Sequence, residues 1–308
     1  MKRLSTGALM VALATACMSA EAQESSDLRR QAFDLLNHPF PSRAMAQDAM
    51  ILYGRAAMDG DVEAALYYHE IRLHLGVPAG IDETRIVARL VSAPEYLQTL
   101  ARFVLSQVYA RGHGAPIDTA ASMRLLRQAA ASGLDSARRE LYQQLRAGPA
   151  ADPAEAVAFL RHVASAYQST MDNLWAMEEL AAVLLDGPAP QRDLREGYRW
   201  AMRAAHGYIA QRRGWRAPAL VAALFEDGLR QDGVQLLAPD PVMAAAWIEI
   251  TLVHLPRNLD APPSPLLAAK ARLGAVLDTA QRARVRERVA SWRYIHPRDL
   301  MHEPFDLP

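Results

Sequence analysis

Glu178 and Glu179 lie beside Trp175, and they are the residues whose types and spacing most suggest chemistry, because glycoside hydrolysis uses a pair of carboxylates. Adjacent residues on a helix point about 100° apart, so these two carboxylates would not face each other across a substrate. The sequence contains no nucleophile elbow, phosphate-binding loop or HExxH motif. We therefore predict a solvated helix face here, and no catalytic residue.

Nine histidines are the candidates for metal binding. His69 and His74 are five residues apart, a spacing that does not bring two imidazoles to one helical face. His296 and His302 lie in a proline-rich stretch that could form an opportunistic metal site, and His113 lies between two glycines of a predicted loop. Because no metal-ligand spacing is present, we predict scattered surface histidines, no metal and no cofactor.

The composition excludes some classes of partner. The 308 residues include 34 basic and 34 acidic side chains, so the net charge is zero, and 51% of the residues are hydrophobic. This composition is typical of a globular protein and argues against a nucleic-acid surface. The most basic stretch, Gln281–Arg288, is expected to be a solvated helix surface.

The first 22 residues have the pattern of a secretory signal peptide. Two basic residues precede an apolar stretch from Gly7 to Met18, and the small-residue site Ala20–Ala22 follows. Cleavage after this site would send the chain to the periplasm or the medium and remove Cys17, the only cysteine, which would exclude disulfides and Cys-ligated zinc. Alternatively, Cys17 is the lipid-anchored residue of a lipoprotein, although Ala14 stands where such signals usually carry Leu. No other stretch has the roughly 20 apolar residues of a membrane span.

A helix with one apolar stripe is predicted before each of five similar glycines. Alanine stands eleven residues before every one of them, and apolar residues stand seven and three before. A glycine at such a helix end is expected to be a left-handed cap. The five are Gly60, Gly112, Gly148, Gly187 and Gly228.

A second helix is predicted after each glycine, because an aspartate follows that suits the N-cap position. Pro153 and Pro241 follow two of these aspartates at the first helical position. A small residue stands four past each aspartate, and a large apolar one seven past, including Trp200 and Trp247, which we expect in the core. The five are Asp61, Asp118, Asp152, Asp193 and Asp240.

The paired helices predict an all-α solenoid, a superhelix of stacked antiparallel pairs, because a single pair cannot bury its apolar face. No segment shows convincing period-two alternation, and Arg230–Pro239 is interpreted as an insertion. Further helices are expected over 83–91, over Ser264–Leu277 and over Thr279–Trp292. A capping box at Ser92–Glu95 is expected to begin the helix that ends at Gly112. The expected domains are the signal peptide 1–22, a lead-in 23–44, about five repeats over 45–255, and a C-terminal region 256–308 with a proline-rich linker, two helices and an extended tail.

The unit Ala101–Gly133, which reads ARFVLSQVYARGHGAPIDTAASMRLLRQAAASG, resembles the Sel-1-like repeat, a relative of the tetratricopeptide repeat. The resemblance implies an α-solenoid, and proteins of this kind are mostly adaptors that assemble partners and, in bacteria, are often exported. One cysteine-rich exported branch is linked to cell-wall compounds, but this chain lacks those cysteines. The matching residues are Ala101, Leu105, Tyr109, Gly112, Gly114, Asp118, Ser122, Leu125, Ala129, Ala130 and Gly133.

Our leading hypothesis is a non-enzymatic exported scaffold that binds a protein or peptide. Trp175 and Trp215 fall outside the packing positions of the repeat, and exposed Trp with nearby Arg is typical of interfaces, although burial would explain them equally well. The alternative is an envelope enzyme or ligand-binding protein acting on peptidoglycan-like material through Glu178 or Glu226. The candidate partner-binding residues are Trp175, Glu178, Trp215, Arg216 and Arg138.

Overall fold

The computed structural model confirms the all-α class, because nearly all of its regular structure is helical. The chain divides into two compact units, 1–143 (unit 1) and 144–308 (unit 2). The expected signal peptide, which includes Cys17, lies outside the described residues, and so does His296 near the other end of the chain. The structure describes residues 23–40, 42–76, 82–148, 151–166, 173–212, 214–257, 259, 261–293, 295 and 299–307.

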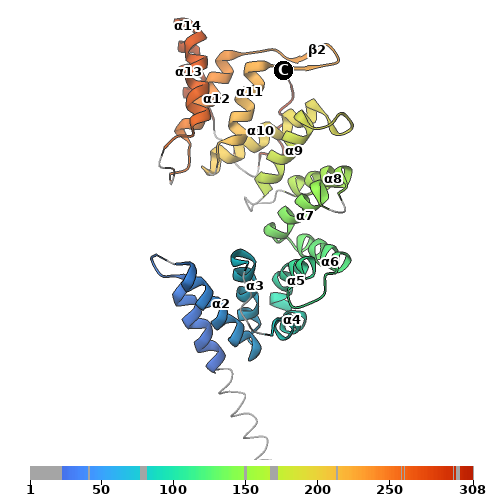
Figure 1. The fold of residues 1–308 in the computed structure, drawn as a ribbon. Helices are drawn as coiled ribbons and strands as arrows, with labels where there is room; N and C mark the ends of the chain where they lie inside the picture. Colours follow the sequence, from blue (N-terminus) through green and yellow to red (C-terminus); the bar gives the residue numbers. More distant parts are fainter. Residues whose placement is uncertain are drawn as a thin grey trace, which may run out of the picture. The chain divides into compact units, whose positions relative to one another are not determined.

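Unit 1 is made of paired helices (Figure 1). Its core includes Met50, Tyr53, Tyr68 and Ile86. A helix over residues 23–36 comes first and contributes Ala32 to this core. Helices α2 and α3 form one pair and α5 and α6 another, and α3 packs on α5. The elements are α2 (Arg43–Met58), α3 (Val62–Leu75), α4 (Glu83–Val91), the 3₁₀ helix η1 (Glu95–Leu97), α5 (Gln98–Arg111) and α6 (Thr119–Ala131); α7 (Asp135–Ala147) crosses the division between the units.

Unit 2 repeats the same arrangement, with α9 packed on α10 and α11 on α12 (Figure 1). Its last two helices, α13 and α14, both pack on α12. Within the described residues no helix is both long and apolar enough to cross a bilayer. The elements are α8 (Pro153–Ser165), α9 (Leu174–Asp186), the 3₁₀ helix η3 (Ala189–Gln191), α10 (Leu194–Gln211), α11 (Arg216–Asp227), β1 (Leu229–Gln231), β2 (Val234–Leu237), α12 (Pro241–Val253), α13 (Ser264–Val276) and α14 (Thr279–Ser291).

The predicted aspartate caps are confirmed at all five positions. Each side chain accepts a hydrogen bond from a backbone N–H in the first turn that follows, which satisfies one of the donors a helix start leaves open. Asp118, for example, accepts from the N–H of Ala121 at 2.8 Å. The capped helices are α3 by Asp61, α6 by Asp118, α8 by Asp152, α10 by Asp193 and α12 by Asp240.

The predicted left-handed glycine cap is confirmed only at Gly112, with φ 74° and ψ 31°. Gly60 has φ 110° but follows the capping residue of α2, and Gly228 has φ 74° with ψ −178°. Gly148 and Gly187 have negative φ, so the expectation is wrong there. At these two a Cβ would collide with the carbonyl oxygen four residues earlier, so glycine gives clearance and not a left-handed turn.

The insertion after α11 is a β-hairpin, β1 paired with β2 in antiparallel register with a bulge. Asp232 and Gly233 form its turn with φ 51° and 81°. Two positive φ values match the turn that best joins twisted strands, and Asp-Gly is its common sequence. Gly228 lies where its Cβ would be 2.6 Å from the carbonyl oxygen of Leu237, which explains the glycine at this helix end.

Helices over 83–91, Ser264–Val276 and Thr279–Ser291 form as expected, within a residue of the predicted ends. The capping box predicted at Ser92 is wrong. The Ser92 hydroxyl instead donates to the carbonyl oxygens of Ala88 and Arg89, which ends α4, and α5 starts without a side-chain cap. Asp278 forms a full capping box with Gln281 at the start of α14.

Candidate functional site

Unit 1 contains a groove of about 800 Å³ between α3, the η1–α5 segment and the start of α7. Tyr67 and Leu100 are 42% and 43% exposed in it, although both are large and apolar. The Tyr67 ring stacks on the buried Tyr53 ring with centroids 5.1 Å apart, which fixes its position in the wall. The apolar lining consists of Leu66, Tyr67, Leu73, Leu97, Leu100, Phe103 and Val104.

Charged and polar side chains also line this groove. Glu63 and Glu70 belong to α3, and Arg111 belongs to α5. Glu63 forms an ion pair with Arg29, and Arg111 donates to the Gln107 side chain at 3.4 Å. An apolar floor with a few charged groups suits apolar side chains of a ligand and orients them through polar contacts.

A buried polar cluster lies in the same unit, formed by Tyr68, His69 and Arg72 of α3, Glu83 of α4 and His113 of the α5–α6 loop. The Tyr68 hydroxyl and the Arg72 Nε both donate to Oε1 of Glu83, at 2.7 and 2.8 Å. Burial opposes ionisation of Glu83, but the hydrogen bonds from Arg72 and Tyr68 outweigh it and lower its pKa. The cluster therefore fastens α3 to α4 with an ionised carboxylate.

His69 is the member of this cluster that sequence reasoning assigned to the surface, and that expectation is wrong. The residue is 1% exposed, and neither ring nitrogen has a hydrogen-bond partner among the described residues. Burial lowers its pKa to about 4. His113 lies in the α5–α6 loop but is half-buried, and burial lowers its pKa as well. Neither histidine is among the residues that line the groove, and the hydrogen bonds of the cluster join α3 to α4.

The predicted partner-binding residues are divided between the two units, with Arg138 in unit 1 and the other four in unit 2. Trp175 is 5% exposed inside unit 2, so of the two alternatives for this indole the structure shows burial. Glu178 on the same helix and Trp215 at the start of α11 are half-buried, and Arg216 is exposed. Arg138 belongs to unit 1, where its Nε donates to the Ala130 carbonyl oxygen near the end of α6 at 3.3 Å. Their roles in partner binding stay predictions.

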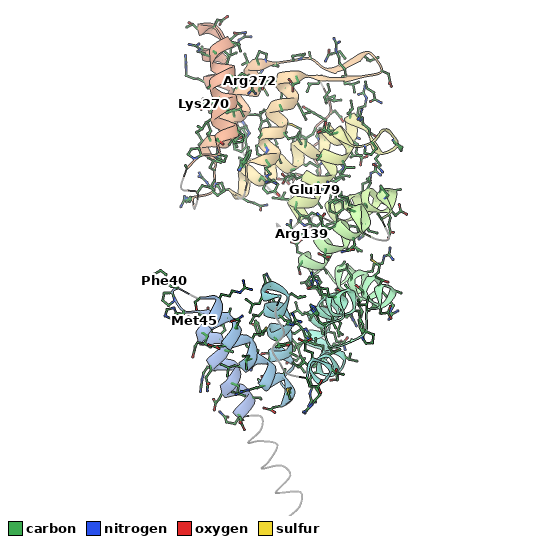
Figure 2. All side chains as sticks on the ribbon, in the orientation of Figure 1. Phe40, Met45, Arg139, Glu179, Lys270 and Arg272 are labelled. Carbon is green, nitrogen blue, oxygen red and sulfur yellow. The ribbon has the colours of Figure 1, made fainter. Side chains whose placement is uncertain are left out.

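Glu226, the second carboxylate of the enzyme alternative, is held by Arg272 of α13. Figure 2 labels Arg272 on that helix. The pair is bidentate: the guanidinium donates from Nε to Oε1 of Glu226 at 2.7 Å and from Nη2 to Oε2 at 2.8 Å. Hydrogen bonding from Arg272 lowers the pKa of Glu226. A general acid needs a raised pKa, so this pair favours a clamp between α11 and α13.

The core positions predicted for two tryptophans are confirmed. Trp200 and Trp247 are 6% and 3% exposed, as core residues. In the described part of the chain, no group of three or more His, Cys, Asp and Glu side chains could hold a metal ion.

The groove residues were missed because the repeat pattern assigns only the packing positions. Their signal is the apolar run Leu66-Tyr67-Tyr68, which is wider than the stripe needed to bury one helix face. Tyr68 fills the core, and Tyr67 is left on the groove side.

No family model and no curated protein matches the chain. Among solved structures, it is similar to a Sel1 repeat protein from Oxalobacter formigenes, with 17% identity, a TM-score of 0.46, and 80% of this chain and 94% of that one covered. It is also similar to a protective antigen present in uropathogenic Escherichia coli strains and displaying an SLR fold, with 15% identity, a TM-score of 0.34, and 92% and 71% covered. Both descriptions name the repeat type that the motifs of this chain resemble, while its all-α architecture of packed helix pairs is established by its own helices and caps.

Proposed function

We propose that this protein is a repeat scaffold that binds a segment of a partner protein in the groove of unit 1. The observation that carries the proposal is the exposure of Tyr67 and Leu100 side by side with other apolar residues of the groove lining. Apolar side chains that gather in a concave surface gain free energy when a ligand removes them from water. The volume of about 800 Å³ accommodates several side chains of a peptide.

The charges of the groove indicate the chemistry of the bound segment. Glu70 is exposed and has no ion pair among the described residues, whereas Glu63 is already paired with Arg29. A partner segment with two or three apolar side chains and one Lys or Arg beside them would complement this surface. The apolar contacts would supply most of the affinity, and the cation would set the orientation.

The test uses a photo-crosslinking residue at position 100 in the full chain, expressed in its native host. We expect crosslinked peptides that are apolar with a flanking Lys or Arg, and we expect Tyr67→Asp to reduce their yield at least fivefold. A crosslinker at Val91, which is 64% exposed on α4 outside the groove, is the matched control. Equal capture of the same peptides from both positions would contradict the proposal, as would hydrolysis of cell-wall material by the purified protein.

We also propose that the scaffold acts in the cell envelope after export. The support is the signal-peptide pattern of residues 1–22. The mass of the mature protein is the test, since cleavage after Ala22 leaves Gln23 first. A chain that begins with an acylated Cys17 would point to a lipoprotein, and a full-length chain in the cytoplasm would contradict export.

A further inference from the structure

The C-terminal segment 299–307, which we name the tail, lies along α10 in unit 2. Leu300 is 1% exposed and packs beside Gly207, where an added Cβ would be 3.4 Å from its Cδ2. Phe305 stacks on His206 with ring centroids 5.2 Å apart. Leu300 thus contacts the later part of α10, and the tail runs back toward the start of the helix.

Two arginines of α10 hold the tail by charge and by hydrogen bonding. Arg203 donates from Nη2 to the Glu303 carbonyl oxygen at 3.3 Å. Arg199 lies 3.7 Å from the Asp306 carboxylate. Positions 199, 203, 206 and 207 share one stripe of the helix, because neighbours on a helical face are three or four residues apart. We name these four residues the α10 stripe.

The α10 stripe ends in a cluster of aromatic rings around His206. The His206 ring stacks on Trp292 with centroids 5.8 Å apart, and the Trp247 ring meets it edge-on at 5.2 Å. Phe305 adds a second stacked ring. Phe305 therefore packs on the His206 ring of this cluster, and an aromatic side chain suits this position because stacking depends on ring geometry.

The tail leaves this site partly unsatisfied. Arg203 Nε, His206 Nδ1 and Trp292 Nε1 are buried and have no hydrogen-bond partner among the described residues. Phe305 has φ 39°, a conformation that side chains other than glycine rarely adopt. The contact to Arg199 is long, and the Asp306 side chain is 72% exposed. A segment with relaxed backbone and a carboxylate placed on Arg203 would fit better than the tail does.

We propose that the α10 stripe is a second binding site, for an extended partner segment with an aromatic residue next to acidic residues, and that the tail occupies this site in cis until such a segment displaces it. The tail sequence DLMHEPFDL shows the chemistry that the site accepts, with Phe305 between Glu303 and Asp306. The site lies in unit 2 and does not depend on the groove of unit 1.

The test uses a fluorescein-labelled peptide DLMHEPFDL and fluorescence anisotropy with the full chain. Phe305→Ala weakens the tail in cis, so this variant should bind the peptide at least tenfold more tightly than the unmodified chain. Adding Arg203→Gln to Phe305→Ala should reverse most of that gain. His302→Ala is the matched control, because His302 is exposed in the same tail, and it should bind as the unmodified chain does.

Several outcomes would overturn the proposal. The first is that the Phe305→Ala variant and the unmodified chain bind the peptide equally tightly. The second is that the tighter binding of the Phe305→Ala variant persists when Arg203→Gln is added. A concentration-dependent dimer of the unmodified chain that Phe305→Ala abolishes would show that the tail serves a second copy, not a partner segment. Hydrogen exchange provides a check without substitutions, since a displaceable tail must exchange its amides faster than α10 does.

Discussion

Arg72 on α3 and Glu83 on α4 form an ion pair with 2.8 Å between Nε and Oε1, and both side chains are largely shielded, at 10% and 17% exposure. Tyr68 donates to the same oxygen. In unit 1 the loop glycine Gly114 packs on the backbone of Glu83, so the pair joins α3, α4 and the α5–α6 loop. This pair is costly to break, because removing the charge of one partner leaves the other charge largely buried and without its counterion.

Glu83→Gln should destabilise unit 1 by about 2 to 3 kcal/mol, somewhat less than for a fully buried pair because water reaches part of it. Urea unfolding followed by circular dichroism measures the change. Asp27→Asn is the control, because its pair with Arg30 is 40% and 71% exposed and such pairs contribute about 0 to 1 kcal/mol. Similar losses in both variants would contradict the structural role of Glu83.

Stability should decrease on acidification, because the folded chain holds His69 and His206 neutral. Burial lowers both pKa values from 6.5 to about 4. Above pH 6.5 neither state binds the proton. Between 6.5 and 4 the unfolded chain binds it and the folded chain does not, so the histidine contribution to stability falls over that window and is constant below it. Each histidine contributes up to about 3 kcal/mol to this loss.

Urea midpoints measured across that window test the expectation in each unit. His69→Leu should flatten the pH dependence of unit 1, and His206→Leu that of unit 2. Unit 1 should keep losing stability as pH falls below 4.5, since the pKa of Glu83 is lowered from that value in the fold. An unchanged slope in both variants would refute the assignment.

Features with local causes were predictable from the sequence. An aspartate N-cap needs only its own carboxylate and the next turn of backbone, so all five caps could be assigned from Asp, Pro and the apolar stripe that follows. The hairpin after α11 had a local signal too, the pair Asp232-Gly233. Its strands of three and four residues are too short to show alternation, and it was therefore missed.

Features that depend on how separate elements pack outside the repeat positions could not be predicted. His69, Glu83 and His113 come from three separate elements, and only the register of α3 against α4 and the loop brings them together. Trp175 lies outside the repeat's packing positions, and its burial depends on side chains that no periodicity specifies. The groove of unit 1 has the same origin, because Leu100 becomes a lining residue only when α5 packs on α3.

Asp240→Ala should cost about 1 kcal/mol, because the carboxylate accepts from the N–H groups of Val242 and Met243 at the start of α12. Asp240→Asn keeps an acceptor at the same place and should cost only a few tenths of that. Denaturant midpoints for unit 2 measure the loss of stability in the two variants. Equal losses would show that the charge of Asp240 matters more than its hydrogen bonds.

Gly114→Ala should be far more destabilising than Gly76→Ala, although the two glycines have similar φ values of 76° and 69°. The left-handed conformation alone costs an alanine about 1 to 2 kcal/mol, and nothing lies within 4 Å of a Cβ at Gly76. At Gly114 the Cβ would be 2.7 Å from the carbonyl carbon and oxygen of Glu83, so the loop or α4 must move.

That movement would also disturb the Arg72–Glu83 pair, so the two changes are coupled. In a double-mutant cycle measured by urea unfolding, Gly114→Ala combined with Glu83→Gln should cost less than the sum of the single changes, because the first already weakens what the second removes. Strict additivity, or equal costs for Gly114→Ala and Gly76→Ala, would mean that the loop does not rest on α4 in solution.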